Sequence, residues 1–165
     1  MKNSKGQKIV FPSPKDKTLG FTISEVLVTL SITSILASMA FPNYLSQVNR
    51  SRQNEASSAI SQIQTTIAAY TDEFGILPTS WSELNDISAI MTQSGPAIAD
   101  NFLPITLAGG FYDVTINNTN NLFMITATST QTPELNIIGC INLSNGASAI
   151  NQGIKSAAAT APSCG

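Results

Sequence analysis

The sequence contains no histidine and only two cysteines among its 165 residues. Without histidine, the chain cannot form a Ser-His-Asp triad, an HExxH zinc site or a zinc cluster with mixed cysteine and histidine ligands. Its length suits one domain of ordinary size. We therefore predict a protein that is not an enzyme, with no catalytic residues, no cofactor and no metal site, although scattered acidic residues leave calcium binding open.

Charged residues are also scarce, at 11% of the chain against about 25% in typical proteins. Serine, threonine and asparagine supply 20, 17 and 14 positions instead. Residues 1–20 hold one acid, Asp16, and five lysines: Lys2, Lys5, Lys8, Lys15 and Lys17. Residues 21–165 hold three cations and nine acids. A basic leader thus precedes an acidic body, which would repel polyanions such as nucleic acid.

An apolar run extends from Phe21 to Phe41 and contains one ionisable group, Glu25. As a helix it would be about 31 Å long, which matches a bilayer core of about 30 Å. Its serine and threonine hydroxyls can bond to carbonyls of the preceding turn. Because the lysines precede the run, the positive-inside rule places the start of the chain in the cytoplasm and the acidic body outside.

Glu25 is the exceptional residue of this run. A carboxylate costs about 2.5 kcal/mol or more at mid-membrane, so it usually marks a function. One interpretation is that Glu25, about 6 Å from the end of the run, simply reaches the headgroups. The functional interpretation requires a cation at the same depth, and no Lys, Arg or His lies between Lys17 and Arg50. The partner would then have to come from elsewhere.

The segment KDKTLGFTISEVLVTLSITSILASMAFPNYL resembles the amino-terminal signature of type IV prepilins and of the pseudopilins of type II secretion. The matching features are a basic leader that ends in Gly20, then Phe21, Glu25 as the fifth residue after the glycine, Pro42 with Tyr44 near the helix midpoint, and Arg50 beyond. The resemblance covers residues 15 to about 55.

The resemblance implies that a prepilin peptidase and methylase cuts between Gly20 and Phe21 and methylates the new amine of Phe21. Cleavage creates a cation at Phe21. The resemblance implies that this amine lies beside Glu25 of a neighbouring subunit, where the pair aligns one subunit with the next during assembly. The implied product is a homo-oligomeric helical filament, together with other pilins, for attachment, twitching motility or DNA uptake. An assembly platform and ATPases extend this filament from the inner membrane to the cell surface. DNA binding is expected only for the assembled filament.

Two other functions stay open. A pseudopilin of a type II secretion system, located in the periplasm, shares the same helix signature. An ordinary signal peptide is the other, because Ser38, Met39 and Ala40 form a small-x-small site that would release residues 41–165 as a soluble binding domain. The apolar run is longer than that of an ordinary signal peptide and contains a carboxylate, and both features disfavour cleavage at that site.

The predicted fold class is α+β. We expect a cleaved leader at 1–20, a transmembrane and assembly half-helix at 21–52 and a globular head at 53–165. One helix is predicted from Phe21 to Phe74, with a kink at Pro42, which lacks an amide hydrogen, and an end at Gly75. Its second half has an apolar stripe whose opposite face carries Ser, Gln, Thr and Asn. This half should lie on the head.

The rest of the chain predicts a short helix and an antiparallel sheet. Ser80 and Glu83 form a capping box for a helix that contains Trp81, Leu84, Ile87 and Ile90. Strands are predicted around 102–107, at 111–117 and 122–128 with a turn at 118–120 between them, and at 135–143.

Export places the head in an oxidising compartment, so Cys140 and Cys164 should form a disulfide. This placement resembles the carboxy-terminal disulfide loop of many pilins, and the alternative is that one cysteine is free. The closed segment is rich in Ser, Ala, Asn and Gly, and we expect the disulfide to hold it in place of a hydrophobic core.

Overall fold

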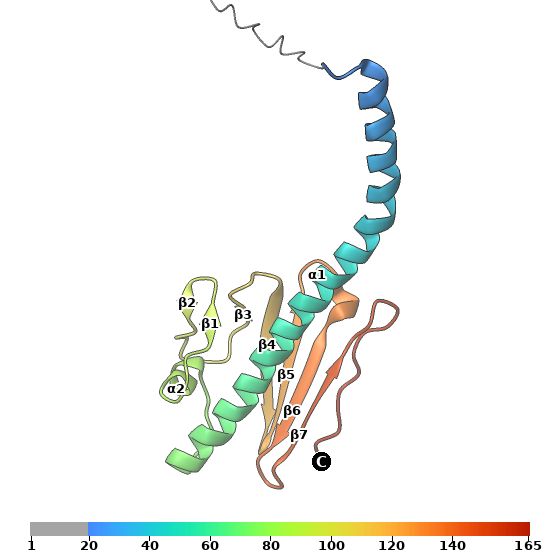
Figure 1. Ribbon diagram of the computed structural model, residues 1–165. Coiled ribbons are helices and arrows are strands. Elements are labelled where there is room, and N and C mark those ends of the chain that lie inside the picture. Colours follow the sequence, from blue (N-terminus) through green and yellow to red (C-terminus); the bar gives the residue numbers. More distant parts are fainter. Residues whose placement is uncertain (1–19) are drawn as a thin grey trace, which may run out of the picture. The chain divides into compact units, whose positions relative to one another are not determined.

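The computed structural model describes residues 20–165 (Figure 1), so the predicted leader lies almost entirely outside the described residues. Within these residues there are two helices and one 3-10 turn: α1 Ile23–Phe74, α2 Trp81–Asn85 and η1 Pro133–Leu135. The strands are β1 Met91–Thr92, β2 Gly95–Pro96, β3 Ile105–Thr106, β4 Tyr112–Thr119, β5 Leu122–Ser129, β6 Ile137–Asn142 and β7 Ala147–Gln152. This is the predicted α+β class.

Helix α1 begins two residues after Phe21 and ends at the predicted residue, Phe74. Gly75 follows with a φ of +70°, and its N–H donates to the carbonyl of Thr71 at 2.9 Å. This left-handed conformation is the usual glycine termination of a helix. The chain forms two compact units, divided between Pro42 and Asn43, and α1 contributes to both.

The second unit contains a five-stranded antiparallel sheet of order β3-β4-β5-β6-β7, so every neighbour in the sheet is also a neighbour in sequence. The small hairpin β1-β2 lies beside the β3 edge, where Thr92 bridges Leu107 and the N–H of Gln93 donates to the carbonyl of Thr106 at 3.4 Å. One edge of the sheet is thereby covered.

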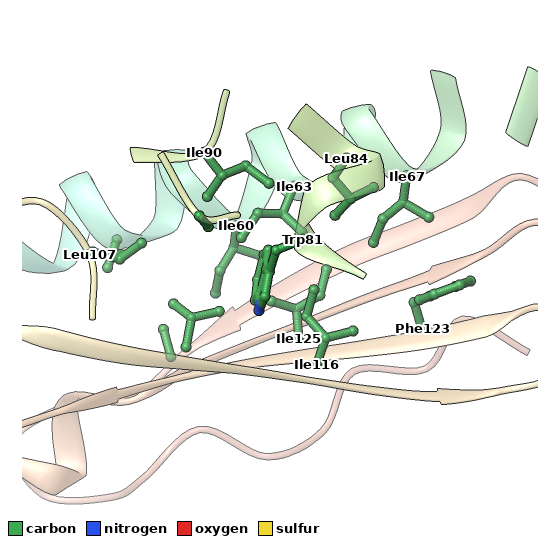
Figure 2. Packing of buried hydrophobic residues seen from close by; sticks show 14 of the residues in the cluster. Ile60, Ile63, Ile67, Trp81, Leu84, Ile90, Leu107, Ile116, Phe123 and Ile125 are labelled. Atoms are coloured by element: carbon green, nitrogen blue, oxygen red, sulfur yellow. The ribbon is translucent and has the colours of Figure 1, made fainter. Parts of the chain in front are cut away.

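The core lies between the sheet and the second half of α1 (Figure 2). Ile60, Ile63 and Ile67 recur at three- and four-residue steps and are fully buried, as the apolar stripe predicts. Trp81 anchors α2 in this core, and its ring contacts Phe102 edge-on at a centroid distance of 5.4 Å. The indole N–H donates to the carbonyl of Leu103 at 2.8 Å, which satisfies its polar atom.

One glycine decides how closely α1 approaches the sheet. A Cβ atom at Gly139 of β6 would lie 2.5 Å from Cγ2 of Ile60. Because real carbon atoms do not approach this closely, the contact between α1 and β6 requires glycine at this position. Successive side chains of a strand point to opposite faces, so the neighbouring Cys140 side chain lies on the outer face of the sheet.

Three polar residues of α1 that the apolar stripe does not include are buried as well. Gln53, Gln64 and Thr66 are buried. The Gln64 amide donates to the carbonyls of Cys140 at 2.8 Å and Ala149 at 3.2 Å, and the Gln53 amide donates to Gly153 at 2.7 Å. A glutamine is long enough to bond across the interface, so it is tolerated at a buried position that a hydrophobicity pattern assigns to solvent.

The short helix is also shorter than predicted. Ser80 caps α2 as expected, accepting the N–H of Glu83 at 3.2 Å, but the Glu83 carboxylate returns to the N–H of Thr79 instead of that of Ser80. The helix ends at Asn85, so Ile87 and Ile90 lie beyond it. The Asn85 side chain accepts the N–H of Ile90 at 3.0 Å and thereby turns the chain out of the helix.

The predicted strands are confirmed with shifted ends. The strand predicted around 102–107 contains only two residues, Ile105–Thr106, and the one predicted at 135–143 begins later because η1 occupies 133–135. The turn between β4 and β5 consists of Asn120 and Asn121, later than predicted, and Asn120 has a φ of +54°. Asparagine tolerates this conformation better than most residues.

Strand β7 was not predicted, and the view that the disulfide replaces a core was too simple. β7 pairs with all six residues of β6, and Ile150 packs against the core. The pair Asn145-Gly146 between the two strands is a strong hairpin signal that the sequence analysis did not use. Gly146 has a φ of +71°, and its N–H donates to the carbonyl of Asn142 at 2.8 Å.

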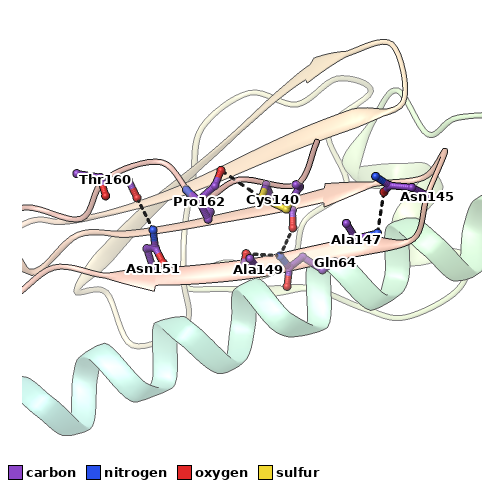
Figure 3. The surroundings of a disulfide bond; sticks show 9 residues. Gln64, Cys140, Asn145, Ala147, Ala149, Asn151, Thr160 and Pro162 are labelled. Atoms are coloured by element: carbon purple, nitrogen blue, oxygen red, sulfur yellow. Dashed lines mark hydrogen bonds between the residues drawn. A yellow bond between two sulfur atoms is a disulfide. The ribbon is translucent and has the colours of Figure 1, made fainter.

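The carboxy-terminal segment crosses the outer face of the sheet, opposite α1 (Figure 3). A disulfide joins Cys140 and Cys164, as predicted, and both residues are buried. Two side chains also hold the segment: the Asn151 amide donates to the carbonyl of Thr160 at 2.9 Å, and Asn136 Oδ1 accepts the N–H of Ala159 at 2.7 Å. The segment is therefore attached at several points along its length.

Candidate processing and assembly site

The predicted cleavage point lies in exposed, irregular backbone. Gly20, Phe21 and Thr22 precede α1, and the Phe21 side chain is 86% exposed. No atom lies within 4 Å of a Cβ placed on Gly20. A protease needs an accessible backbone around the bond that it cuts, and both residues of the Gly20–Phe21 bond are exposed.

Thr22 and Glu25 form a reciprocal capping box at the start of α1. The Glu25 carboxylate accepts the N–H of Thr22 at 2.8 Å and its hydroxyl at 2.6 Å. In return, the Thr22 hydroxyl lies 3.2 Å from the N–H of Glu25 and accepts it. Two amides at a helix start that would otherwise lack a partner are satisfied in this way.

The capping box adds a role for Glu25 that the sequence analysis missed. The residues Thr22-Ile23-Ser24-Glu25 have the S/T-x-x-E spacing of a capping box, the same signal that located α2. A negative charge in the first turn also interacts favourably with the helix dipole. Glu25 thus has hydrogen-bond partners within its own chain, but those partners carry no positive charge.

The first half of α1 is apolar and exposed. Helix α1 contains a segment that is long and apolar enough to span a membrane by its length and composition, and this segment is not buried in the molecule. Large apolar side chains such as Leu30 and Ile35 are more than half exposed. Hydrophobic surface of this extent needs a partner, which lipid or neighbouring helices can provide.

The hydroxyl groups of this half bond to their own helix, as predicted. The hydroxyls of Ser31, Thr33 and Ser34 each donate to the carbonyl four residues earlier, at 2.7–2.8 Å. Thr29 and Ser38 donate to the carbonyl three residues earlier. These bonds satisfy the hydroxyls internally and lower the cost of placing them in lipid.

Pro42 lies inside α1, at the last position of the first compact unit. It cannot donate a backbone hydrogen bond, yet the residues on both sides are helical. The kink at Pro42 stays a prediction. Within residues 20–165, no group of three or more acidic, cysteine or histidine residues is placed to hold a metal ion.

Comparison with known proteins gave one match, which covers the predicted cleavage point and the first half of α1. No curated protein and no solved structure matched the sequence. One family model matched, the prokaryotic N-terminal methylation motif, at residues 15–41. The match covers the end of the basic leader, the Gly20–Phe21 bond, Glu25 and the apolar helix. The chain therefore carries the leader signature of type IV pilins and pseudopilins. A long helix with an apolar first half and an α+β head with a disulfide follow this signature.

Proposed function

We propose that this chain is a structural subunit of a type IV pilus. The precursor is anchored in the inner membrane by the first half of α1, with its leader in the cytoplasm. A prepilin peptidase removes residues 1–20 and methylates the amine of Phe21. The subunit then joins a helical filament with its head outward, with the help of an assembly platform and ATPases.

One observation carries this proposal: an exposed, irregular Gly20–Phe21 bond directly precedes a capped helix whose exposed apolar half contains a single carboxylate. The match to the methylation motif covers the same residues. An ordinary secretory signal peptide does not need a carboxylate within its apolar run.

Cleavage would give Glu25 a charged partner in addition to Thr22. The new amine at Phe21 is a cation, and none exists between Lys17 and Arg50 in the precursor. A carboxylate held by Thr22 is fixed in rotamer, and a fixed charge aligns a partner better than a mobile one. In our proposal, the capping box holds Glu25 in position and the amine of an adjacent subunit neutralises it.

The disulfide-closed carboxy-terminal segment supports a pilus rather than a secretion pseudopilus. In the families that the helix signature resembles, such a loop is common among pilins, whereas the major pseudopilin usually carries a calcium-binding end. Electron microscopy of sheared cell-surface material addresses this choice. Long fibres that contain this chain are expected, and its restriction to the periplasm would favour the pseudopilin alternative.

Mass spectrometry of the amino-terminal peptide tests processing. We expect a mature chain that starts at Phe21 with one added methyl group on its amine. A start at Phe41 would mean release by signal peptidase after Ala40 and would overturn the proposal. Substitution of Gly20 by a bulky residue should block the cut, and the precursor should then accumulate in the membrane.

Paired substitutions separate the two roles of Glu25. Glu25→Gln keeps an oxygen that can accept the N–H of Thr22 but removes the charge, so we expect normal processing and no fibres. Thr22→Ala removes the cap at a cost of about 1 kcal/mol and keeps the charge, now less firmly held, so fibres should persist at a lower yield. The opposite pattern, in which Glu25→Gln forms fibres and Thr22→Ala forms none, would show that capping is the only role of Glu25.

A further inference from the structure

The two edges of the five-stranded sheet differ. The β3 edge is two residues long and is covered by the β1-β2 hairpin through the Thr92–Leu107 bridge. At the other edge, β7 is six residues long, and no backbone group of the described residues outside β6 forms a hydrogen bond with its backbone. β7 also contains no proline and no charged side chain.

Sheet edges that face water are normally protected by short length, charge, proline or a covering segment, because an open edge pairs with other chains. The carboxy-terminal segment does not supply this cover, since it lies on the outer face of the sheet above Cys140 (Figure 3). An unprotected edge of six residues is therefore expected to be covered in the assembled state.

The surface beside β7 is uncharged and combines apolar side chains with hydroxyl and amide groups. A groove of about 550 Å³ lies between residues 61–68 of α1 and residues 148–150 of β7, and its lining has no charged side chain. Directly after β7, the turn at 154–157 presents Ile154, which is 61% exposed, and Lys155. The β7 edge, the groove and this turn form one strip, which we call the β7 surface.

Charge narrows the choice of partner. Residues 43–165 carry eight acids and three cations, a formal net charge of −5. Arg52 is already engaged: its guanidinium lies 3.6 Å from the ring centroid of Phe111 and donates to Gln131 at 2.8 Å. Lys155 is exposed and is the only cation after Arg52. Heads of this charge repel each other when packed closely, so a contact at Lys155 with an acid is favoured.

The same chain presents a matching surface in the segment 97–103. This segment has no helix or strand and exposes Ile98 and Leu103, 74% and 59% respectively, on either side of the exposed Asp100. Its ends are held by α2, because the carbonyl of Ala97 accepts the Asn85 amide and that of Leu103 accepts the Trp81 indole. A loop fixed in this way loses little entropy on binding.

Asp72 and Glu73 also lie near exposed apolar residues, but they belong to the last turn of α1. Their exposed apolar neighbours, Phe74 and Ile76, lie on one side of them in the sequence, whereas Asp100 has an exposed apolar residue on each side. The segment around Asp100 is therefore the better match to the β7 surface.

Resting on the proposed filament, we propose that the β7 surface of one subunit binds segment 97–103 of a second copy, with Lys155 facing Asp100 of that copy. Ile98 and Leu103 cover the groove and Ile154. The two surfaces are different patches of the same chain, so the contact is head-to-tail and continues from copy to copy, as a helical filament requires.

Charge reversal in cells that produce the full chain tests this contact, with sheared-fibre yield as the measurement. Lys155→Glu and Asp100→Lys each place like charges together, and we expect each to lower the yield by about tenfold. The double variant restores the opposite charges in exchanged positions and should recover most of the yield. Asp72→Lys, at another exposed acid, is the matched control and should not rescue Lys155→Glu.

The outcomes separate this contact from the proposed function. If the wild-type chain forms fibres and Lys155→Glu leaves their yield unchanged, the contact is overturned and the pilus proposal stays intact. The same holds if Asp72→Lys rescues Lys155→Glu as efficiently as Asp100→Lys does. Absence of fibres from the wild-type chain, with normal export, would overturn both. Ser148→Lys is a second variant: a charge on the exposed edge should lower the yield without changing the protease resistance of the head.

Discussion

The two halves of α1 use the same backbone in different surroundings. From Ile23 to Pro42, the large apolar side chains are exposed and the polar groups are hydroxyls and one carboxylate. In the second half, the apolar stripe from Ala56 to Tyr70 is buried on the sheet, and glutamine amides bond to carbonyls of the head. The halves meet at Pro42, where the two compact units divide.

The hydrogen-bond partners of the polar side chains explain this difference. Every hydroxyl bond seen between residues 29 and 38 returns to the same helix, which suits a segment surrounded by lipid or by other apolar helices. Gln53, Gln62 and Gln64 instead bond to carbonyls of strands and loops. The second half of α1 is therefore specific for this head, whereas the first half is suited to any apolar partner of the right length.

The largest difference should appear when one apolar side chain is shortened in each half. Ile63→Ala removes three buried carbon atoms from the core and should lower the free energy of unfolding of the head by about 4 kcal/mol. Leu30→Ala, at a residue that is 58% exposed, should leave it unchanged. Urea unfolding of the full chain in detergent, followed by Trp81 fluorescence, provides the measurement. Similar losses from the two variants would contradict the division of α1 into separate environments.

Removal of the disulfide should again affect only the head. Cys140→Ser together with Cys164→Ser opens a loop with a sequence separation of 24, and the loop-entropy relation gives a loss of about 3.5 kcal/mol. Because β7 and the Asn136 and Asn151 side chains also hold this region, we expect the head to fold in mild conditions. Urea unfolding with and without reductant measures the loss, and the wild-type chain under reductant should match the double variant. A midpoint that does not move would show that the segment is held without the bond.

Much of the architecture could be predicted because it depends on local patterns. The long helix, its end at Gly75, the Ser80 cap, the β4-β5 hairpin and the disulfide each follow from residue type and spacing over a few positions. The match of the methylation motif at residues 15–41 confirms the signature itself. Cleavage after Gly20, the role of Glu25 in assembly and the kink at Pro42 stay predictions, because they depend on a protease, a membrane and neighbouring subunits.

The errors arose where tertiary contacts override the local pattern. Buried Gln64 could not be predicted, since its acceptors on β6 and β7 are 76 and 85 residues away in sequence. Strand β7 has a weak pattern of its own and is stabilised by pairing with β6. In contrast, the capping box of Thr22 and Glu25 is a local signal, and it was missed because the apolar run drew attention to the charge of Glu25 alone.

Substitution of Gln64 tests whether amides distinguish the two halves of α1. Gln64→Leu keeps the approximate size but leaves the carbonyls of Cys140 and Ala149 without this donor. A buried polar group that loses its hydrogen-bond partner lowers the free energy of unfolding by about 1–3 kcal/mol. We therefore expect Gln64→Leu to lower it by about 2 kcal/mol. Gln47→Leu, at an exposed position of the same helix, should change it by less than about 0.5 kcal/mol. Equal effects would mean that Gln64 acts only by filling space.

The smallest effect on the stability of the head is expected from ionisation of its buried tyrosines at alkaline pH. Burial raises the pKa of Tyr112 above its usual value near 10, against the smaller opposing effects of Ser129 and Arg52. Burial also raises the pKa of Tyr70, assisted by the charges of Glu83 and Asp86. A raised pKa means that the folded head favours the neutral phenol, so the associated stability is present below about pH 10 and is lost as the pH rises through the raised values.

Tyr112→Phe removes the hydrogen bond from the phenol to the carbonyl of Leu135, which spans 3.0 Å. At pH 7 this should cost about 1 kcal/mol, and the loss of stability between pH 9 and pH 11 should become shallower than in the wild-type chain. Tyr44→Phe is the matched control, because the ring of Tyr44 is 66% exposed in the second half of α1. It should leave the stability at pH 7 unchanged. If Tyr112→Phe lost stability between pH 9 and pH 11 as steeply as the wild-type chain, the alkaline sensitivity of the head would not arise from the buried phenol of Tyr112.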